Sequence, residues 1–428
     1  MSKLRVLVVG ASIAGPTAAY WFAKAGASVT VIERFPKLRV GGQSVDIRTI
    51  GVTTMRRMTG LEAAVRAKVA PIEGISLIDT KGKPYGTIKT TGDPDQQSLV
   101  SEYEIFRGDL SKILYDMTKD DRNIQYVFNE HIAAIRRDDN SGPVTVEFAN
   151  GLPVAPFDLV VACDGATSRT RALGFDCGVR DHFEPVNSWA AYFTIAQDLV
   201  NGSRIGHAYS AVGGRFIAVG GDASGGNRVV AMAIHPRPSS PNGPDDMAPF
   251  REAAAKGDDA LKRFVGAHIS DAGWKCKEIA EGLASADDFY ATEIVQVKSP
   301  ALFKGRVVLV GDAGYAPGPT GMGTSLALAG AYVLAGEVAR HPGSLEEGLQ
   351  AYEERMRPIA DKAQRIPMGM PGVFAPYTAG GLRLRNIVFA IVCRTGLLEF
   401  LHRFGSWAFA KNDEPGGGLE EYEFLVKG

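Results

Sequence analysis

The stretch LRVLVVGASIAGPTAAYWFAKAGASVTVIER, residues 4–34, constrains the fold of this chain more than any other part of it. Residues 6–9 are an apolar run of the kind that forms a parallel strand covered on both faces. A helical pattern follows over residues 16–24 and stops at Gly26, and a second strand is expected over residues 28–32. Strand, tight turn, helix and strand in this order predict a βαβ unit that binds a dinucleotide.

The turn departs from the usual G-x-G-x-x-G pattern, because Ser12 stands where the second glycine is expected. Gly10 allows the tight turn, and Gly15 lets the helix pack closely on the strand. The unpaired N–H groups and positive dipole end of the helix suit a pyrophosphate, which a small Ser12 still lets approach. A glycine-rich turn without a ligand is the alternative. The predicted contacts are Gly10, Ser12, Ile13, Ala14 and Gly15.

Glu33 follows the second strand, where a carboxylate can accept hydrogen bonds from ribose hydroxyls. The same charge would repel a 2′-phosphate. The sequence therefore favours FAD or NAD over NADPH at this first site.

Two later segments repeat the strand-then-acid pattern. DLVVACDGATSRTRALGF, residues 158–175, places Asp164 after a buried strand, and GRVVLVGDAGYAPGPTGMGTSLALAGAYVLAGEV, residues 305–338, does the same with Gly311 and Asp312. Open α/β sheets bind ligands at the carboxyl ends of such strands. A helix is expected from about Thr324, and the residues before it could present N–H groups to a phosphate or to the oxygen-rich edge of a flavin.

Together the three motifs resemble those of the FAD-dependent monooxygenases of the aromatic-hydroxylase group, class A, over roughly residues 4–365. The chain is most similar to the subgroup of tetracycline-inactivating and polyketide-tailoring enzymes. The resemblance implies an α/β fold: a three-layer, Rossmann-like FAD-binding domain, an inserted mixed or antiparallel sheet that binds substrate, and a C-terminal helix. It also implies that the first motif binds the ADP part of FAD, that Asp164 lies between FAD and the nicotinamide cofactor, and that Asp312 binds the ribityl chain.

Further residues are assigned by the same resemblance. Glu33 and Arg34 would meet the adenosine, and Asp46 would lie near the flavin. Arg39 would meet NADPH, and Arg107, at a helix start, would contact FAD. The loop before the helix expected from Thr324 would contribute Pro319, Gly321, Met322 and Gly323.

This chain departs from the family pattern in places. Tyr315 replaces the usual histidine and Thr324 a frequent asparagine, so Tyr315 either stacks beside the flavin or fills space. The W-x-W-x-I-P segment of flavin halogenases is absent.

The motifs divide the chain into a discontinuous FAD-binding domain (1–70, 100–180 and 290–365), two substrate-binding inserts (71–99 and 181–289) and a C-terminal loop and bridging helix (366–428). The first insert reads as a hairpin that turns at Gly82, and the second as several strands followed by two helices. A helix over 382–410 is expected to pack on the body. The inner face of the inserted sheet would line the substrate cavity, with Tyr192, Tyr209, Phe216 and Met232 as candidates, and Tyr315 beside the flavin.

The resemblance implies a reaction in which NADPH or NADH reduces the flavin and O₂ then forms a C4a-hydroperoxide. That species would oxygenate a lipophilic aromatic, enolic or polyketide-like small molecule. No catalytic acid or base is identified from the sequence. Two alternatives stay open: a flavin-dependent dehydrogenase or desaturase, and a non-catalytic binding protein on the same fold.

Composition excludes other classes of function. The net charge of −1 lacks the excess of basic residues that is typical of nucleic-acid-binding proteins. The four cysteines show no metal-ligand spacing, so no metal is expected. Reduced thiols and the absence of a signal-peptide pattern favour a cytoplasmic protein. No stable membrane insertion is expected, because the apolar run before Arg394 spans only eight residues. The sequence carries no signal for an oligomeric state.

Overall fold

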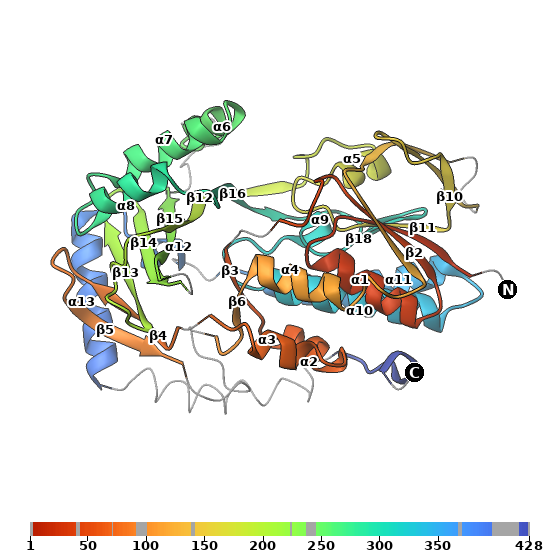
Figure 1. Cartoon of the computed structure of the whole chain (residues 1–428), viewed down its shortest axis with the longest axis horizontal. Coiled ribbons are helices and arrows are strands. Elements are labelled where there is room, and N and C mark those ends of the chain that lie inside the picture. The colour runs from red at the N-terminus through yellow and green to blue at the C-terminus, as the bar shows by residue number, and fades with distance from the viewer. Residues whose placement is uncertain are drawn as a thin grey trace.

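The computed structural model describes residues 3–39, 43–70, 72–90, 101–137, 142–222, 225–236, 245–366, 370–395 and 419–426. Two bodies lie side by side in Figure 1, one built on a mostly parallel sheet and the other on a mixed sheet.

The first body contains a six-stranded sheet. Its strands stand in the order β17 (Phe303–Lys304), β18 (Val307–Leu309), β11 (Leu159–Ala162), β1 (Arg5–Val9), β2 (Ser28–Glu33) and β7 (Ile124–Phe128). All neighbours are parallel except β17 and β18. Both faces of β1 are buried, as an apolar run in a parallel sheet predicts.

Helices and a second sheet cover the two faces of this sheet, which gives the expected three layers. Val6 and Val8 of β1 pack toward α1 (Ala14–Lys24) and α10 (Gly323–Arg340), with α11 (Leu345–Ala363) against α10. Leu7 and Val9 pack toward a small antiparallel sheet of β8 (Ile132–Arg136), β9 (Val144–Phe148) and β10 (Ala155–Phe157). The βαβ prediction is therefore confirmed.

The second body is built on a seven-stranded mixed sheet. Its order is β16 (Tyr290–Val297), β12 (Phe183–Ile195), β15 (Asn227–Ile234), β14 (Arg215–Gly221), β13 (Ile205–Ala211), β4 (Gly74–Ile78) and β5 (Pro84–Lys89). Only β13 and β4 run parallel. The β4–β5 hairpin turns at Gly82, whose φ is +80°, as the sequence predicted.

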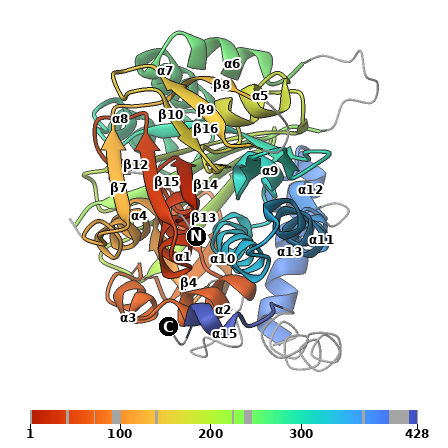
Figure 2. The ribbon, with the colours of Figure 1, turned by 90° about the vertical axis from the view of Figure 1, so that its right-hand side faces the viewer.

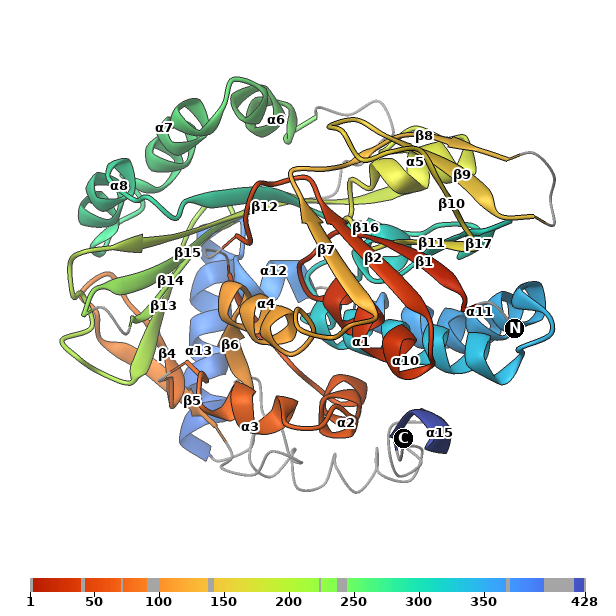
Figure 3. The same cartoon turned by 45° about the vertical axis from the view of Figure 1, so that its right-hand side comes forward.

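One face of the mixed sheet is covered by α6 (Ala248–Ala255), α7 (Asp258–Ile269) and α8 (Cys276–Ala284), as Figure 3 shows. Helices α6 and α7 were predicted and α8 was not. Strand β16 was expected among the FAD-binding segments, but it pairs with β12 along its whole length. The sequence assigned residues 290–297 to the FAD-binding domain without identifying their partner strand, so the boundary at residue 290 cuts through a sheet.

Two buried glutamines tie the mixed sheet to the first body. The side-chain amide of Gln296, on β16, donates to the carbonyls of Pro317 and Gln364 at 3.0 and 2.6 Å. The amide of Gln364 donates in turn to the carbonyls of Val297 and Ala316 at 2.7 and 3.1 Å. Because all four acceptors are main-chain carbonyls, these hydrogen bonds fix β16 against the loop that precedes α10.

The remaining elements pack around the two sheets. They are β3 (Ser44–Asp46), α2 (Ile50–Arg57), α3 (Leu61–Arg66), β6 (Glu104–Phe106), α4 (Arg107–Asp116), α5 (Arg169–Phe175), α9 (Asp312–Tyr315), α12 (Met370–Phe374), α13 (Ala379–Thr395) and α15 (Glu423–Val426).

The C-terminal helices pack on different bodies. Cys393 of α13 lies against Gly86 of β5, where an added Cβ would be 2.6 Å from the thiol sulfur. The other end of the helix predicted over 382–410 lies outside the described residues. Helix α15 lies beside α2 in Figure 2, where Arg57 donates to the carbonyl of Glu420 at 2.9 Å. No helix in the described ranges is long and apolar enough to cross a bilayer.

His268 makes the stability of the second body sensitive to acid. Its ring lies 5.0 Å from that of Trp189, and its buried Nε2 has no hydrogen-bond partner within the described part of the chain. Burial, and then the charge of Arg215, lower the pKa of His268 to about 4.

A folded-state pKa below the unfolded value means that the unfolded chain binds more protons between the two values, so stability falls as the pH falls. We predict that the free energy of unfolding decreases by about 2 kcal/mol between roughly pH 7 and pH 5 through this residue. The variant His268→Phe should lose most of this decrease in urea titrations at the two pH values. An equal decrease in both proteins would contradict the assignment.

Candidate cofactor and substrate site

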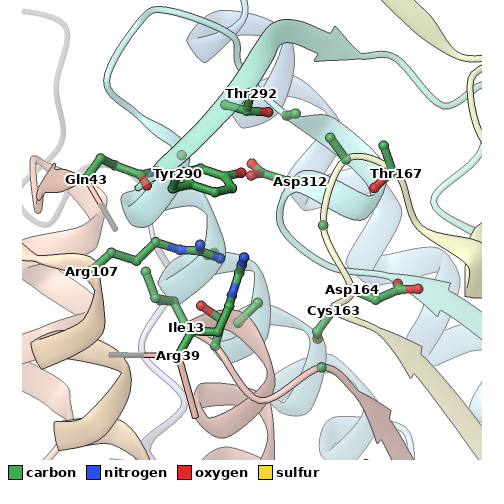
Figure 4. Close-up of a pocket in the computed structure, with 18 of the residues that line it drawn as sticks. Ile13, Arg39, Gln43, Arg107, Cys163, Asp164, Thr167, Tyr290, Thr292 and Asp312 are labelled. Carbon is green, nitrogen blue, oxygen red and sulfur yellow. The ribbon is translucent and has the colours of Figure 1, made fainter. Parts of the chain in front are cut away.

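A cavity of about 1410 Å³ lies between the carboxyl ends of β1, β2 and β11 and the inner face of the mixed sheet. It is lined by residues from every motif that the sequence analysis identified. Figure 4 shows part of its wall.

The strand-to-helix turn forms one end of the cavity. Gly10 has a φ of +105°, and a Cβ there would lie 2.6 Å from the carbonyl oxygen of Cys163. A Cβ on Gly15 would lie 1.8 Å from the carbonyl oxygen of Gly10, so only glycine lets α1 start so close to β1. The lining residues of this turn are Gly10, Ala11, Ser12, Ile13 and Ala14, whereas Gly15 does not line the cavity.

Glu33 holds the same turn in place. Its two carboxylate oxygens accept hydrogen bonds from the amides of Ala11 and Phe35, at 2.9 and 3.1 Å. Each oxygen keeps a second lone pair for a ligand hydroxyl, because a carboxylate can accept about four hydrogen bonds. Arg34, exposed at the cavity edge, lies 4.7 Å from the centre of the Phe35 ring.

Three charged side chains reach into the middle of the cavity. Arg107 lies at the start of α4, Arg39 lies 5.4 Å from the centre of the Tyr290 ring, and Asp312 starts α9 (Figure 4). Within the described residues, none of these three side chains makes a hydrogen bond or an ion pair. Desolvation and the nearby charge of Arg107 lower the pKa of Arg39.

Asp312 is open to the cavity although it lies deep in the fold. Desolvation by the surrounding protein raises the pKa of its carboxyl, and the charge of Arg107 opposes that rise. Charges of both signs that lack protein partners indicate a site for a polar ligand that supplies those partners.

Asp164 lines the cavity edge, but its carboxylate is used within the protein. It accepts hydrogen bonds from the hydroxyl of Ser168 and from the amide and hydroxyl of Thr170, at 3.1 and 3.0 Å for Thr170. Figure 4 shows the carboxylate turned away from Arg39 and Arg107. The structure therefore gives Asp164 a role in holding the start of α5.

The loop before α10 closes the far side of the cavity. Pro319, Gly321 and Gly323 line it, and Gly321 has a φ of +75°. Met322 and Gly311, which the sequence placed with them, do not line it. Asp46 does, and its carboxylate accepts from the guanidinium of Arg48 at 2.9 Å.

The five substrate candidates divide into two groups. Tyr192 and Met232 line the cavity, and Tyr192 stacks on Tyr290 with ring centres 6.4 Å apart. Burial raises the pKa of the Tyr192 hydroxyl to about 12, so it stays a hydrogen-bond donor at neutral pH.

The other three candidates do not line the cavity. Tyr209 lies on the helix-covered face and donates to the carbonyl of Ala272 at 2.7 Å, because alternation along β13 turns it away. Phe216 shares the face of Met232 but contacts Phe374 of α12. Tyr315 is buried, with its hydroxyl 3.1 Å from that of Tyr352, so it fills space in the core.

Sequence reasoning missed four notable cavity residues: Gln43, Glu104, Tyr290 and Thr292. Gln43 and Glu104 lie on or beside strands of three residues, which are too short to show an alternating pattern. Tyr290 and Thr292 lie on β16, and the alternation in YATEIVQV could have identified them had the strand been assigned to the substrate sheet.

A βαβ unit, two further strands with acids at their carboxyl ends, and a long cavity shared with a mixed sheet define a flavin-dependent oxidoreductase. The chain belongs to the FAD binding domain family, whose model matches residues 3–366.

Relatives agree along the whole chain. The FAD-dependent monooxygenase asL4 of Sarocladium schorii is 32% identical over 100% of both chains. Monooxygenase CTB7 of Cercospora beticola is 32% identical over 99% of this chain and 98% of its own. The crystal structure of tetracycline destructase Tet(55) superposes with a TM-score of 0.73 at 28% identity, over 92% of this chain and 96% of that one.

This protein is an FAD-dependent monooxygenase of class A, with FAD as cofactor and NAD(P)H as the reductant typical of the family. Its reaction uses O₂ and a small-molecule substrate. The two alternatives left open by the sequence, a dehydrogenase and a non-catalytic binding protein, receive no support from these relatives.

Gly15 offers a direct test of the close approach of α1 to β1. We predict that Gly15→Ala destabilises the protein by about 3 kcal/mol or more and lowers its FAD content, because the new methyl group meets main-chain atoms that cannot move aside. Thermal unfolding and the flavin absorption of the purified protein measure both effects. The control Gly343→Ala, at a position with no atom within 4 Å of the added Cβ, should change neither. Two equally stable variants would contradict the prediction.

Proposed function

We propose that the cavity holds FAD between the turn at residues 10–15 and the loop before α10. Glu33 and Arg34 would meet the adenosine, the N–H groups at the start of α1 the pyrophosphate, and Asp312 the ribityl hydroxyls. Arg107 would pair with an anionic or carbonyl oxygen of the cofactor. The observation that carries this proposal is that Arg107 and Asp312 face the cavity without partners among the described residues.

The cofactor supplies the redox and oxygen chemistry when it is bound, and the chain supplies position, polarity and exclusion of water. The aromatic pair Tyr192–Tyr290 would cover the ring end of the cofactor from the mixed sheet. The hydrogen bonds made by the side chains of Gln296 and Gln364 would hold that sheet at a fixed distance from the flavin.

The substrate that we propose is a lipophilic aromatic, enolic or polyketide-like molecule. The inner wall of the mixed sheet supports this class, because it presents Ile75, Tyr192, Met232 and Ile294 to the cavity. Apolar walls with a few convergent polar groups are the usual form of a small-molecule site. A relative named for the destruction of tetracycline shares the fold at 28% identity.

We further propose NADPH as the reductant, with Arg39 as its contact, and a cytoplasmic location. Arg39 supports the first proposal, because its guanidinium makes no hydrogen bond or ion pair within the described ranges and an arginine suits a 2′-phosphate. The free thiols of all four cysteines support the second, because reduced cysteines are typical of that compartment.

The purified protein should be yellow and should oxidise NADPH with uptake of O₂ when a suitable polycyclic phenol or enolic polyketide is added. Two results would contradict the proposed substrate class. One is NADPH oxidation at the same rate with and without substrate, and the other is no NADPH oxidation with any member of a broad panel of phenols and enols. Colourless protein that takes up no FAD would contradict the proposed cofactor site.

We predict that Asp312→Ala weakens FAD binding by roughly ten- to a hundredfold, because a hydrogen bond to a charged group contributes about 1.5–3 kcal/mol. Quenching of flavin fluorescence on titration measures the dissociation constant. Asp176→Ala, which removes an exposed carboxylate paired with Lys304, is the matched control and should bind FAD normally. Equal affinities of the two variants would refute the role of Asp312.

A further inference from the structure

The strand pair β3–β6 brings two carboxyl groups together in the cavity wall. Asp46 and Glu104 are directly opposite each other in the antiparallel register, so their side chains lie on the same face. Both line the cavity, as do the apolar residues Ile75 and Val45. Neither the sequence motifs nor the proposed contacts to FAD give Glu104 a role.

The two carboxyl groups have different partners. Asp46 is paired with the guanidinium of Arg48, at 3.1 and 2.9 Å from Nε and Nη2. Glu104 accepts only from the hydroxyl of Ser44, at 2.7 Å from Oε1, and its Oε2 has no hydrogen-bond partner within the described chain. Arg48 therefore stabilises the charge of Asp46 directly, whereas no cation from the described residues forms an ion pair with Glu104.

This asymmetry affects the proton affinity of the two carboxyl groups. Burial raises the pKa of the Glu104 carboxyl, the charge of Asp46 raises it further, and Ser44 and Arg48 oppose the rise. Burial also raises the pKa of Asp46, against the attraction of Arg48. Adjacent carboxyls whose surroundings separate their proton affinities are a common arrangement for acid–base work at neutral pH.

A second unpaired acceptor lies beside β3, but the surrounding protein covers it. The side-chain oxygen of Gln43, which directly precedes β3, is buried and has no partner among the described residues (Figure 4). Because Oε2 of Glu104 has no partner among the described residues, it calls for a ligand that donates a hydrogen bond. A permanently cationic donor would meet the like charges of Arg39 and Arg107 in the same cavity, so a neutral hydroxyl is the better complement.

We propose that Glu104 is the proton-transfer group for a substrate that carries a phenolic or enolic hydroxyl. The O–H bond of the substrate breaks, the proton passes to Oε2 of Glu104, and the electron pair stays on the substrate oxygen. The resulting oxyanion makes the adjacent ring carbon electron-rich, which is what an electrophilic oxygen transfer needs. This inference rests on the proposed function, because it assigns the substrate's chemical class.

The test uses the FAD-loaded enzyme and 7-hydroxycoumarin, an aromatic phenol whose absorption moves to longer wavelength when it ionises. In the wild type, the apparent pKa of the bound phenol should lie at least about one unit above that in Glu104→Gln, because the Glu104 carboxylate is a like charge beside the phenolate, whereas a glutamine of the same size is neutral. Glu104→Asp should restore part of the difference. Equal values in wild type and Glu104→Gln would overturn the proposal.

Kinetics separate this role from a structural one. Phenol-stimulated NADPH oxidation should fall on the order of a hundredfold in Glu104→Gln, with loss of the acidic limb of its pH profile. FAD content and anaerobic flavin reduction by NADPH alone should stay at wild-type values. Glu184→Gln, which makes the same change at an exposed ion pair with Lys298, should match the wild type throughout.

The outcomes distinguish this proposal from the proposed function. A Glu104→Gln enzyme with normal phenol-stimulated rates would overturn the role of Glu104 and leave the function intact. A wild type that neither binds 7-hydroxycoumarin nor responds to any phenol would contradict the substrate class, and the role of Glu104 with it.

Discussion

The close approach of α1 to β1 is the contact on which the cofactor site depends. A Cβ on Gly15 would lie 1.8 Å from the carbonyl oxygen of Gly10, and one on Gly10 would lie 2.6 Å from that of Cys163. Both glycines therefore bring main chain to main chain at the point where β1 and β11 end. Because Glu33 hydrogen-bonds the amide of Ala11, the same turn also fixes the end of β2. One tightly packed turn thus sets the relative positions of three strand ends.

Electrostatics then determines what this scaffold can bind. Arg39, Arg107 and Asp312 face the cavity, and none of them forms a hydrogen bond or an ion pair with a described side chain. Asp164 and Asp46, in contrast, are already engaged by neighbouring residues. The first three side chains are therefore available to a ligand, whereas Asp164 and Asp46 stabilise the protein itself. Only the structure distinguishes these two groups of charged residues.

The sequence predicted the parts of this protein that rest on local pattern. The βαβ unit, the hairpin at Gly82, helices α6 and α7 and the acids after the strands follow from periodicity and turn chemistry, which depend on neighbouring residues only. It could not predict that β16 joins the substrate sheet, because pairing with β12 joins residues about a hundred positions apart.

The same limit applies to the side chains of the cavity. Tyr209 and Tyr192 both lie in apolar, alternating strands, and the sequence does not say which face of the sheet α6 to α8 cover. Tyr315 sits in a family motif, yet it points into the core toward Tyr352, where Gly330 makes room for its hydroxyl. The sequence did not identify Glu104, because a strand of three residues is too short to show an alternating pattern of apolar and polar residues.

The central claim is that strand ends far apart in the sequence form one elongated site for a single FAD. A crystal structure of the FAD-loaded protein tests this most directly. The account predicts one FAD per chain that contacts Glu33, Arg107 and Asp312 together. An FAD bound elsewhere, or one that leaves Arg107 and Asp312 without contact to it, would contradict the account.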